Sequence, residues 1–370
     1  MKNLSSKKTG VLACLFLLSL VFASFGCSNQ MKVATVTNDS NQCWSEEKAN
    51  QWYAEQPWLV GCDYIPATAI NQIEMWSKDT FDPKQIDKEL GWAQGIGFNT
   101  LRVFLSSVVY KNDSQGMKTR MGDFLTICEK HGIRPMFVFF DDCWNPESTY
   151  GKQPDPKPGV HNSGWLQDPS VSLRQDTTKM YSELKTYVQD ILKTFKADKR
   201  VLMWDLYNEP GNSKHGITSL PLLRKVFEWA RECDLTQPIT AGVWTFDCPE
   251  LNAFQLKNSD VISYHSYNPA EEHAVTIKYL QALNKPLVCT EYMARRNNST
   301  FQTILPLLKQ NKIVAINWGF VSGKTNTIFA WDTPLPNEKE PKLWFHDIFR
   351  QDGTPFSQAE VDTIKVLTKK

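Results

Sequence analysis

Short apolar runs alternate with longer amphipathic segments about eight times along this chain of 370 residues. Strands are expected where the apolar runs lie, at 58–64, 100–105, 134–140, 201–206, 239–243, 261–264, 287–290 and 313–317. Helices are expected in the segments between them, such as 83–94, 120–130, 178–195, 220–233, 271–283 and 300–310. Apolar strands that alternate with helices predict a parallel sheet buried on both faces. Eight such units close into a (β/α)8 TIM barrel of the α/β class.

Two of the expected strands end in a glutamate. The run 201–206 leads into Asn208-Glu209-Pro210, and the proline ends the strand because it has no N–H to give to a ladder. The run 287–290 leads into Glu291, three strand–helix units further on at roughly 25 to 30 residues per unit. The two glutamates are therefore expected to close strands 4 and 7, at the barrel end where such folds keep their chemistry.

These strand ends resemble a known family. The strands ending in Asn208-Glu209 and in Glu291 look like the acid/base and nucleophile strands of the retaining glycoside hydrolases of clan A. Family 5, the cellulase and mannanase family, is the most similar by pattern, from about residue 58 to about residue 323. The resemblance implies that Glu209 is the acid/base and Glu291 the nucleophile in double displacement at a β-glycoside, which needs two carboxyl groups about 5 to 5.5 Å apart. Ordinary strand-end carboxylates held in salt bridges are the alternative.

Four further residues match the pattern of the same family. Arg102 lies inside an apolar strand, where an unpaired cation is unfavourable, so it needs a carboxylate partner. The resemblance makes that partner the nucleophile; a purely structural ion pair is the alternative. His265 and Tyr267 resemble the family's His-x-Tyr, in which the histidine contacts substrate and the tyrosine donates a hydrogen bond to the nucleophile, although a lone histidine is often a buried, satisfied one. Asn208 is expected to bond the sugar 2-hydroxyl, a contact that strengthens in the transition state.

Aromatic residues near the strand ends are candidates for sugar binding. Trp318, just past the last expected strand, resembles the sugar platform of the clan, because an aromatic face suits the C–H-rich face of a pyranose. After the third strand the chain departs from the family, with Asp-Asp-Cys-Trp at 141–144 in place of a motif that contains histidine. Trp144 is a second candidate for a sugar platform, and in the long loop 145–170 His161 and Trp165 are expected to form a wall of the sugar site.

Three polar residues are candidates to bond sugar hydroxyls. Asp141 and Asp142 follow the third strand, and Asn71 follows the first. Because large loops at a barrel mouth tend to block a through-cleft, the loop 145–170 leaves an exo-acting pocket and an endo-acting groove equally open. The sugar stays open as well, among β-mannoside, β-glucoside, β-xyloside and β-galactoside.

The first residues of the chain predict export. Three lysines among the first eight residues precede an apolar segment, 11–25, that ends in Gly26-Cys27. This pattern is typical of a secretory signal and is too short for a comfortable membrane span. We expect a lipoprotein signal peptide at 1–26 with Cys27 lipidated, a tether at 27–45 and a single catalytic domain at 46–370. The expected location is a bacterial cell envelope, on its periplasmic or surface face, or outside the cell if ordinary signal cleavage occurs instead.

Composition narrows the expected partners and cofactors. The net charge is +1 with acids and bases mixed throughout, which does not favour nucleic acid. Apart from Cys14 and Cys27, seven cysteines remain, an odd number, so at least one thiol stays free in the monomer that we expect. The chain lacks a Cys-x-x-Cys pair and a strand-1 His-x-His, so neither a metal nor an organic cofactor is expected.

Two other classes of barrel protein fit this pattern less well. A phosphate-binding barrel needs a glycine-rich loop after strand 7 or 8, and Ser-Gly-Lys at 322–324 is too short to indicate one. A lipid-anchored glycan-binding protein on a barrel without catalysis is the stronger alternative. A binding protein does not need two glutamates together with Arg102, so the sequence favours the hydrolase.

Overall fold

The computed structural model describes residues 43–369, and at its centre eight parallel strands form one sheet. The strands are β1 (Val60–Asp63), β2 (Thr100–Phe104), β3 (Arg134–Asp141), β4 (Met203–Asn208), β5 (Ile239–Thr240), β6 (Ile262–His265), β7 (Leu287–Glu291) and β8 (Val314–Asn317). Hydrogen-bonded neighbours follow the order β5-β4-β3-β2-β1-β8-β7-β6. The sheet closes on itself through a parallel bridge between Val243 and Tyr264, which joins the β5 and β6 edges. The predicted (β/α)8 barrel is confirmed.

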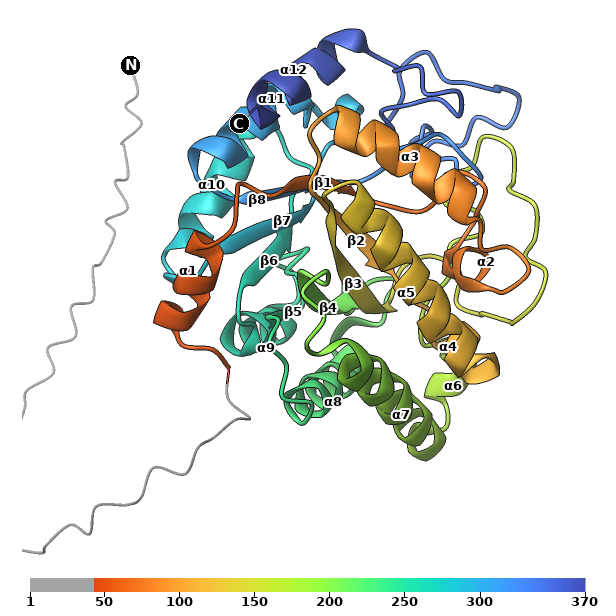
Figure 1. The fold of residues 1–370 in the computed structure, drawn as a ribbon, viewed down its shortest axis with the longest axis vertical. Coiled ribbons are helices and arrows are strands. Elements are labelled where there is room, and N and C mark those ends of the chain that lie inside the picture. The colour runs from red at the N-terminus through yellow and green to blue at the C-terminus, as the bar shows by residue number, and fades with distance from the viewer. Residues whose placement is uncertain (1–42, 370) are drawn as a thin grey trace, which may run out of the picture. The chain divides into compact units, whose positions relative to one another are not determined.

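Helices surround the ring of strands, as Figure 1 shows. Those of the described part are α1 (Glu46–Ala54), α2 (Gln72–Trp76), α3 (Pro83–Gly95), α4 (Ser107–Asn112), α5 (Ser114–Lys130), α6 (Val171–Arg174), α7 (Thr177–Phe195), α8 (Leu220–Arg231), α9 (Pro249–Asn258), α10 (Ala270–Gln281), α11 (Phe301–Gln310) and α12 (Gln358–Thr368). Local sequence sets several of their ends. The Asp82 carboxylate caps α3 by accepting from the backbone N–H of Lys84 and Gln85, and Gly132, at φ 67°, ends the turn after α5.

The amino-terminal end of the barrel interior is apolar. Its side chains form one buried cluster: Leu59, Met136, Leu202, Met203, Val261, Val288, Val314 and Ile316. Trp52 and Tyr53 of α1 pack against this cluster and cover that end of the barrel. The charged residues of the interior therefore lie toward the carboxyl ends of the strands, where a barrel carries its site.

The strand β5 is shorter than predicted. Side chains from the end of α9 take the backbone groups that a longer ladder would use: Ser259 Oγ accepts from Ala241 N–H at 3.3 Å, and Gln255 Nε2 donates to Gly242 O at 2.6 Å. The next ladder contact of this segment is the bridge from Val243 to Tyr264.

Other predictions concern cysteines and the amino-terminal segment. All seven cysteines of the described residues are free thiols. No helix within residues 43–369 has the length and apolar character needed to cross a membrane. The predicted signal peptide and Cys27 lie outside the described residues, as does most of the predicted tether.

Candidate active site

Glu209 and Glu291 meet at the carboxyl end of the barrel. Glu291 is the last residue of β7, and Glu209 directly follows β4. An oxygen of Glu209 and an oxygen of Glu291 lie within 4.8 Å of each other, and the two side chains are 13% and 6% exposed. This spacing suits retaining glycosidases, since inverting enzymes hold their carboxyls about 6.5 to 9.5 Å apart to admit a water.

The backbone at Glu209 turns out of the strand in a conformation that few non-glycine residues adopt. Its φ is 44°, in the left-handed region, where a non-glycine residue needs support from its surroundings. Asp142 supplies part of that support by accepting from Gly211 N–H at 2.7 Å and from Tyr207 Oη at 2.7 Å. The turn after β4 is thus fixed to the end of β3, and Glu209 is directed toward β7.

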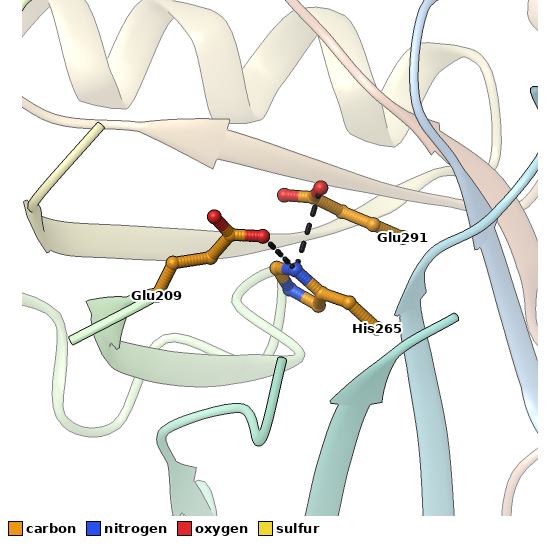
Figure 2. A group of neighbouring side chains, drawn as sticks. All are labelled: Glu209, His265 and Glu291. Carbon is orange, nitrogen blue, oxygen red and sulfur yellow. Dashed lines mark hydrogen bonds and ion pairs between the residues drawn. The ribbon is translucent and has the colours of Figure 1, made fainter. Parts of the chain in front are cut away.

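His265, at the end of β6, lies between the two carboxyl groups (Figure 2). Its Nδ1 is 2.8 Å from Glu209 Oε1 and 3.4 Å from Glu291 Oε2. Burial lowers the pKa of His265 to about 4, so the ring is neutral near pH 7. The imidazole therefore forms a hydrogen bond with Glu209 and adds no positive charge beside the two glutamates. The predicted contact of His265 with substrate stays a prediction, and its ring contacts Glu209 in the structure.

Arg102 spans the barrel interior from β2 and joins three other strands. Its Nη1 lies 2.9 Å from Asp63 of β1 and 2.9 Å from Glu291 of β7, and its Nη2 lies 2.8 Å from Asp205 of β4. The Arg102 side chain is fully buried. It therefore has the carboxylate partner that its place in an apolar strand requires. Sequence reasoning missed Asp63 and Asp205, although each carries the same signal as Arg102, a charge within an apolar strand.

The surroundings of Glu291 favour its ionised form more than those of Glu209 do. Burial is the largest influence on both carboxyls, and it raises the pKa of each. Against this, Glu291 receives hydrogen bonds from Arg102 and, at 2.7 Å, from Tyr267 Oη. Two carboxylates so close together do not ionise equally, and the guanidinium in contact with Glu291 makes it the one to lose its proton first.

Asn208 and Asp141 are hydrogen-bonded to each other at the edge of the cavity. Asn208 Oδ1 accepts from Arg102 at 2.6 Å, and its Nδ2 donates to Asp141 Oδ1 at 2.9 Å. Asp141 also accepts from Cys143 N–H at 2.9 Å and from Trp165 Nε1 at 2.7 Å, and burial raises its pKa to about 6. Both residues line the cavity. Asp141 has both oxygens engaged by protein donors, and its predicted bond to a sugar hydroxyl stays a prediction.

Two predicted sugar contacts need correction, because neither residue lines the cavity. Asp142 is fully buried and accepts from Arg174, Tyr207, Ser219 and the Gly211 N–H. Asn71 is equally buried: its Oδ1 caps α2, and its Nδ2 donates to Gly164 O at 2.9 Å. All these contacts are internal, and both side chains hold loops rather than ligand. A polar residue after a strand is compatible with either role, which is why sequence alone did not separate them.

The glutamates open into a cavity of about 900 Å³. Trp318, Trp144 and His161 line it as predicted. The Trp318 ring stands edge-on to Trp165 at 5.6 Å, and Trp144 is 38% exposed at the rim. His161 Nδ1 is hydrogen-bonded to Phe329 O at 2.8 Å, and burial lowers its pKa to about 4.

Several cavity residues were missed by sequence reasoning: Cys143, Asn212, Trp244, Phe246 and Trp331. Trp331 belongs to the segment after β8, which has no strand or helix pattern to place it. Cys143 could have been predicted, because it lies between Asp142 and Trp144, both of which were candidate site residues.

Glu209, His265 and Glu291 also form a group close enough to hold a metal ion. Their donor atoms are two carboxylates and one neutral imidazole, a set that several metals accept. However, the Arg102 guanidinium lies 2.9 Å from Glu291 and already neutralises that side of the group. The group formed by Glu209, His265 and Glu291 is therefore better suited to proton transfer than to binding a metal cation beside Arg102.

Comparison with known proteins agrees with this geometry. The sequence pattern of Cellulase (glycosyl hydrolase family 5) matches residues 66–323. Searched against curated proteins, the sequence finds no match. Similar solved structures include a GH5_18 protein from Streptomyces cattleya in complex with Manβ1-4GlcNAc, with 11% identity, coverage of 84% of this chain and 79% of that one, and a TM-score of 0.58.

Two further structures share the fold. A glycoside hydrolase family 5 mannosidase from Rhizomucor miehei has 16% identity, 85% and 93% coverage, and a TM-score of 0.52. An exo-β-1,4-mannosidase from an Opitutaceae bacterium, strain TAV5, has 18% identity, 84% and 59% coverage, and a TM-score of 0.56. The family pattern covers more than half of the chain, and the two carboxyls have the spacing of a retaining site. The protein therefore belongs to glycosyl hydrolase family 5 and is a retaining β-glycoside hydrolase.

Proposed function

We propose that Glu291 is the nucleophile and Glu209 the acid/base of this hydrolase. The observation that carries the assignment is the asymmetry around the pair. Arg102 contacts Glu291 at 2.9 Å, whereas the hydrogen-bonding neighbours of Glu209 are His265, Asn212 and Cys143, which are uncharged near pH 7. An ionised nucleophile and a protonated acid are the starting states that double displacement requires.

In the first step, Glu291 forms a bond to the anomeric carbon while the bond from that carbon to the leaving oxygen breaks. The proton of Glu209 passes to that oxygen, so the aglycone leaves as a neutral alcohol. In the second step, Glu209 takes a proton from water, and the oxygen of this water replaces Glu291 at the anomeric carbon. Each step inverts the anomeric centre, so the product keeps the β-configuration. The glycan-binding alternative explains neither two buried carboxyls with oxygens within 4.8 Å of each other nor this asymmetry.

A terminal or internal β-mannoside is the substrate that we propose to test first. Support comes from solved structures of the same fold, two of which are named as mannosidases. The cavity of about 900 Å³ is large enough for an oligosaccharide segment. Aryl β-mannosides, β-glucosides, β-xylosides and β-galactosides tested side by side identify the sugar.

Replacing Glu209 with alanine should slow hydrolysis by an amount that depends on the leaving group. For poor leaving groups such as another sugar, loss of the general acid should cost about 10² to 10⁴-fold in kcat/KM. For a dinitrophenyl glycoside, which needs no proton, glycosylation should continue, and added azide should accelerate turnover and yield a β-glycosyl azide. Steady-state kinetics on both substrates check this. An equal loss on both would contradict the acid/base assignment.

Cys143 should influence the pH dependence of the reaction through Glu209. Its Sγ donates to Glu209 Oε2 at 3.2 Å, a bond that favours the ionised glutamate and opposes the rise in pKa caused by burial. Cys143→Ala should therefore raise the pKa of Glu209 and move the basic limb of the kcat/KM profile to higher pH. Cys248→Ala removes a half-buried thiol outside the cavity and serves as the matched control. If the basic limb stays in place in Cys143→Ala, the hydrogen bond has no catalytic effect.

For the segment before the described residues we propose a lipid anchor at Cys27, which places a monomeric enzyme at a bacterial cell envelope. The support is the pattern of three lysines, an apolar segment and Gly26-Cys27. Cys27→Ala should release the protein from the membrane fraction, since the anchor is the only membrane contact proposed. Fractionation with immunoblotting measures this. Unchanged partitioning into membranes would contradict the anchor.

A further inference from the structure

Two long loops at the barrel mouth are joined to each other through their backbones. They are the β3 loop (142–170) and the β8 loop (318–357). The Asn162 N–H donates to Thr325 O at 2.8 Å, and the Leu335 N–H donates to Gly159 O at 3.0 Å. Gly159 has a φ of 65°, and a Cβ there would lie 2.0 Å from Leu335 O. The two backbones therefore approach more closely than a side chain at position 159 would allow. The two loops lie together at one edge of the barrel (Figure 1).

The β1 loop (64–71) extends this contact. The Asn71 amide donates to Gly164 O of the β3 loop at 2.9 Å, and the Lys324 N–H of the β8 loop donates to Ala67 O at 3.1 Å. Gly323 again permits a close approach, because a Cβ there would lie 2.5 Å from Ala67 O. The three loops thus form one continuous wall, which we call the loop wall.

Cys143 of the β3 loop contacts Glu209, and the outer part of the loop wall lies beside the nucleophile. Trp331 of the β8 loop packs edge-on against Tyr267 at 5.0 Å, and Tyr267 is the residue that donates to Glu291. His161 of the β3 loop lies 6.4 Å from the Trp331 ring in another edge-on contact. The loop wall therefore reaches the nucleophile through Trp331 and Tyr267.

Another part of the same cavity, formed by the segment after β5, is aromatic and partly exposed. Trp244 lies there, and its Nε1 donates to Pro210 O at 3.1 Å, next to Glu209. Beyond it, Phe246 is 59% exposed and packs edge-on at 5.7 Å against Tyr279 of α10, which is 57% exposed. Exposed aromatic rings at the rim of a sugar site offer faces on which pyranose rings can pack. These aromatic residues lie beside Glu209, the residue that would protonate the leaving group.

We propose that the enzyme acts from the non-reducing end of a β-linked oligosaccharide and releases one sugar at a time. The loop wall stops the chain beyond the sugar that Glu291 attacks, and the rest of the chain extends over Trp244 and Phe246. This inference rests on the proposed function and specifies which part of a glycan fits each end of the cavity.

The test uses β-1,4-linked mannohexaose, cellohexaose and xylohexaose tagged at the reducing end, together with the matching β-glycosyl fluorides. The earliest products should be an untagged monosaccharide and a tagged pentasaccharide. Tagged disaccharide or trisaccharide at early times would show internal cleavage and overturn the proposal. Turnover of a fluoride without cleavage of the matching hexaose would contradict the proposal that the rest of the chain binds over Trp244 and Phe246. Failure on every fluoride and every hexaose, and on the aryl β-galactoside as well, would contradict the proposed function itself.

A second variant tests the aromatic side separately. Phe246→Ala should lower kcat/KM about threefold to tenfold on the cleaved hexaose, the range expected for one aromatic contact. Hydrolysis of the glycosyl fluoride, whose leaving group is a single atom, should not change. Val366→Ala removes an apolar side chain of α12 that is 63% exposed and lies outside both the cavity and the loop wall, and it should leave both activities unchanged. An equal loss on hexaose and fluoride in Phe246→Ala would contradict a role in binding the leaving group.

Discussion

Glu291→Ala should reduce kcat by at least about 10⁴-fold on every substrate, including those with good leaving groups, because the covalent route loses its nucleophile. The loss should not depend on pH in the range where the wild type works. A thermal unfolding curve must accompany the kinetics, since the substitution also removes one of the three carboxylates around Arg102.

Azide should restore turnover in Glu291→Ala by a different route. It enters the space left by the carboxylate and displaces the aglycone directly, so the product inverts once and is an α-glycosyl azide. Wild-type enzyme with azide provides the control and should give no α-azide. A β-azide from Glu291→Ala would show that Glu291 is the acid/base and would reverse the assignment.

Arg102→Met should destabilise the fold as well as the site. The substitution leaves Asp63, Asp205 and Glu291 buried around an apolar side chain, and breaking a buried ion pair in this way costs about 3 to 5 kcal/mol in the free energy of unfolding. Burial already raises the pKa of all three carboxyls, and loss of the guanidinium, which lowers these pKa values, would raise them further above those of the unfolded chain. Their protonated forms favour the folded state, so the stability lost relative to wild type should grow as pH rises from about 4 to 7.

A surface arginine provides the comparison for this prediction. Arg200 pairs with Asp198 at 2.7 Å but is 29% exposed, and Arg200→Met should cost no more than about 1 kcal/mol. Denaturant unfolding of the wild type and both variants at several pH values measures the difference. Equal stability of Arg102→Met and Arg200→Met, without pH dependence, would show that the buried network is not needed for folding.

The barrel could be predicted because each strand is a buried apolar run bounded by polar residues. All eight strands formed near the predicted positions, and the ends of β4 and β7 brought Glu209 and Glu291 together. Arg102 was predictable for the same reason, since a charge in such a strand requires a buried partner. Which carboxylates surround it was less evident, because Asp63, Asp205 and Glu291 come from three other strands.

The loops could not be predicted in the same way. Asp142 and Asn71 sit where substrate contacts are common, yet their partners are the backbone at Gly211 and Gly164, distant in sequence. The loop wall depends on backbone contacts at Gly159 and Gly323 that follow no periodic pattern. Trp331 reaches the site only through that wall. The residues that shape the cavity therefore emerge from tertiary contacts rather than from local sequence.

Covalent trapping of the glycosyl enzyme tests the central claim most directly. A 2-deoxy-2-fluoro-β-glycosyl fluoride of the hydrolysed sugar loses fluoride as the nucleophile bonds to its anomeric carbon, and the 2-fluorine slows release by destabilising the oxocarbenium-like transition state. After digestion, mass spectrometry should find the fluorosugar on the peptide that contains Glu291. A label on the Glu209 peptide, or full turnover of the trap's parent glycoside with no labelled peptide at all, would contradict double displacement at Glu291.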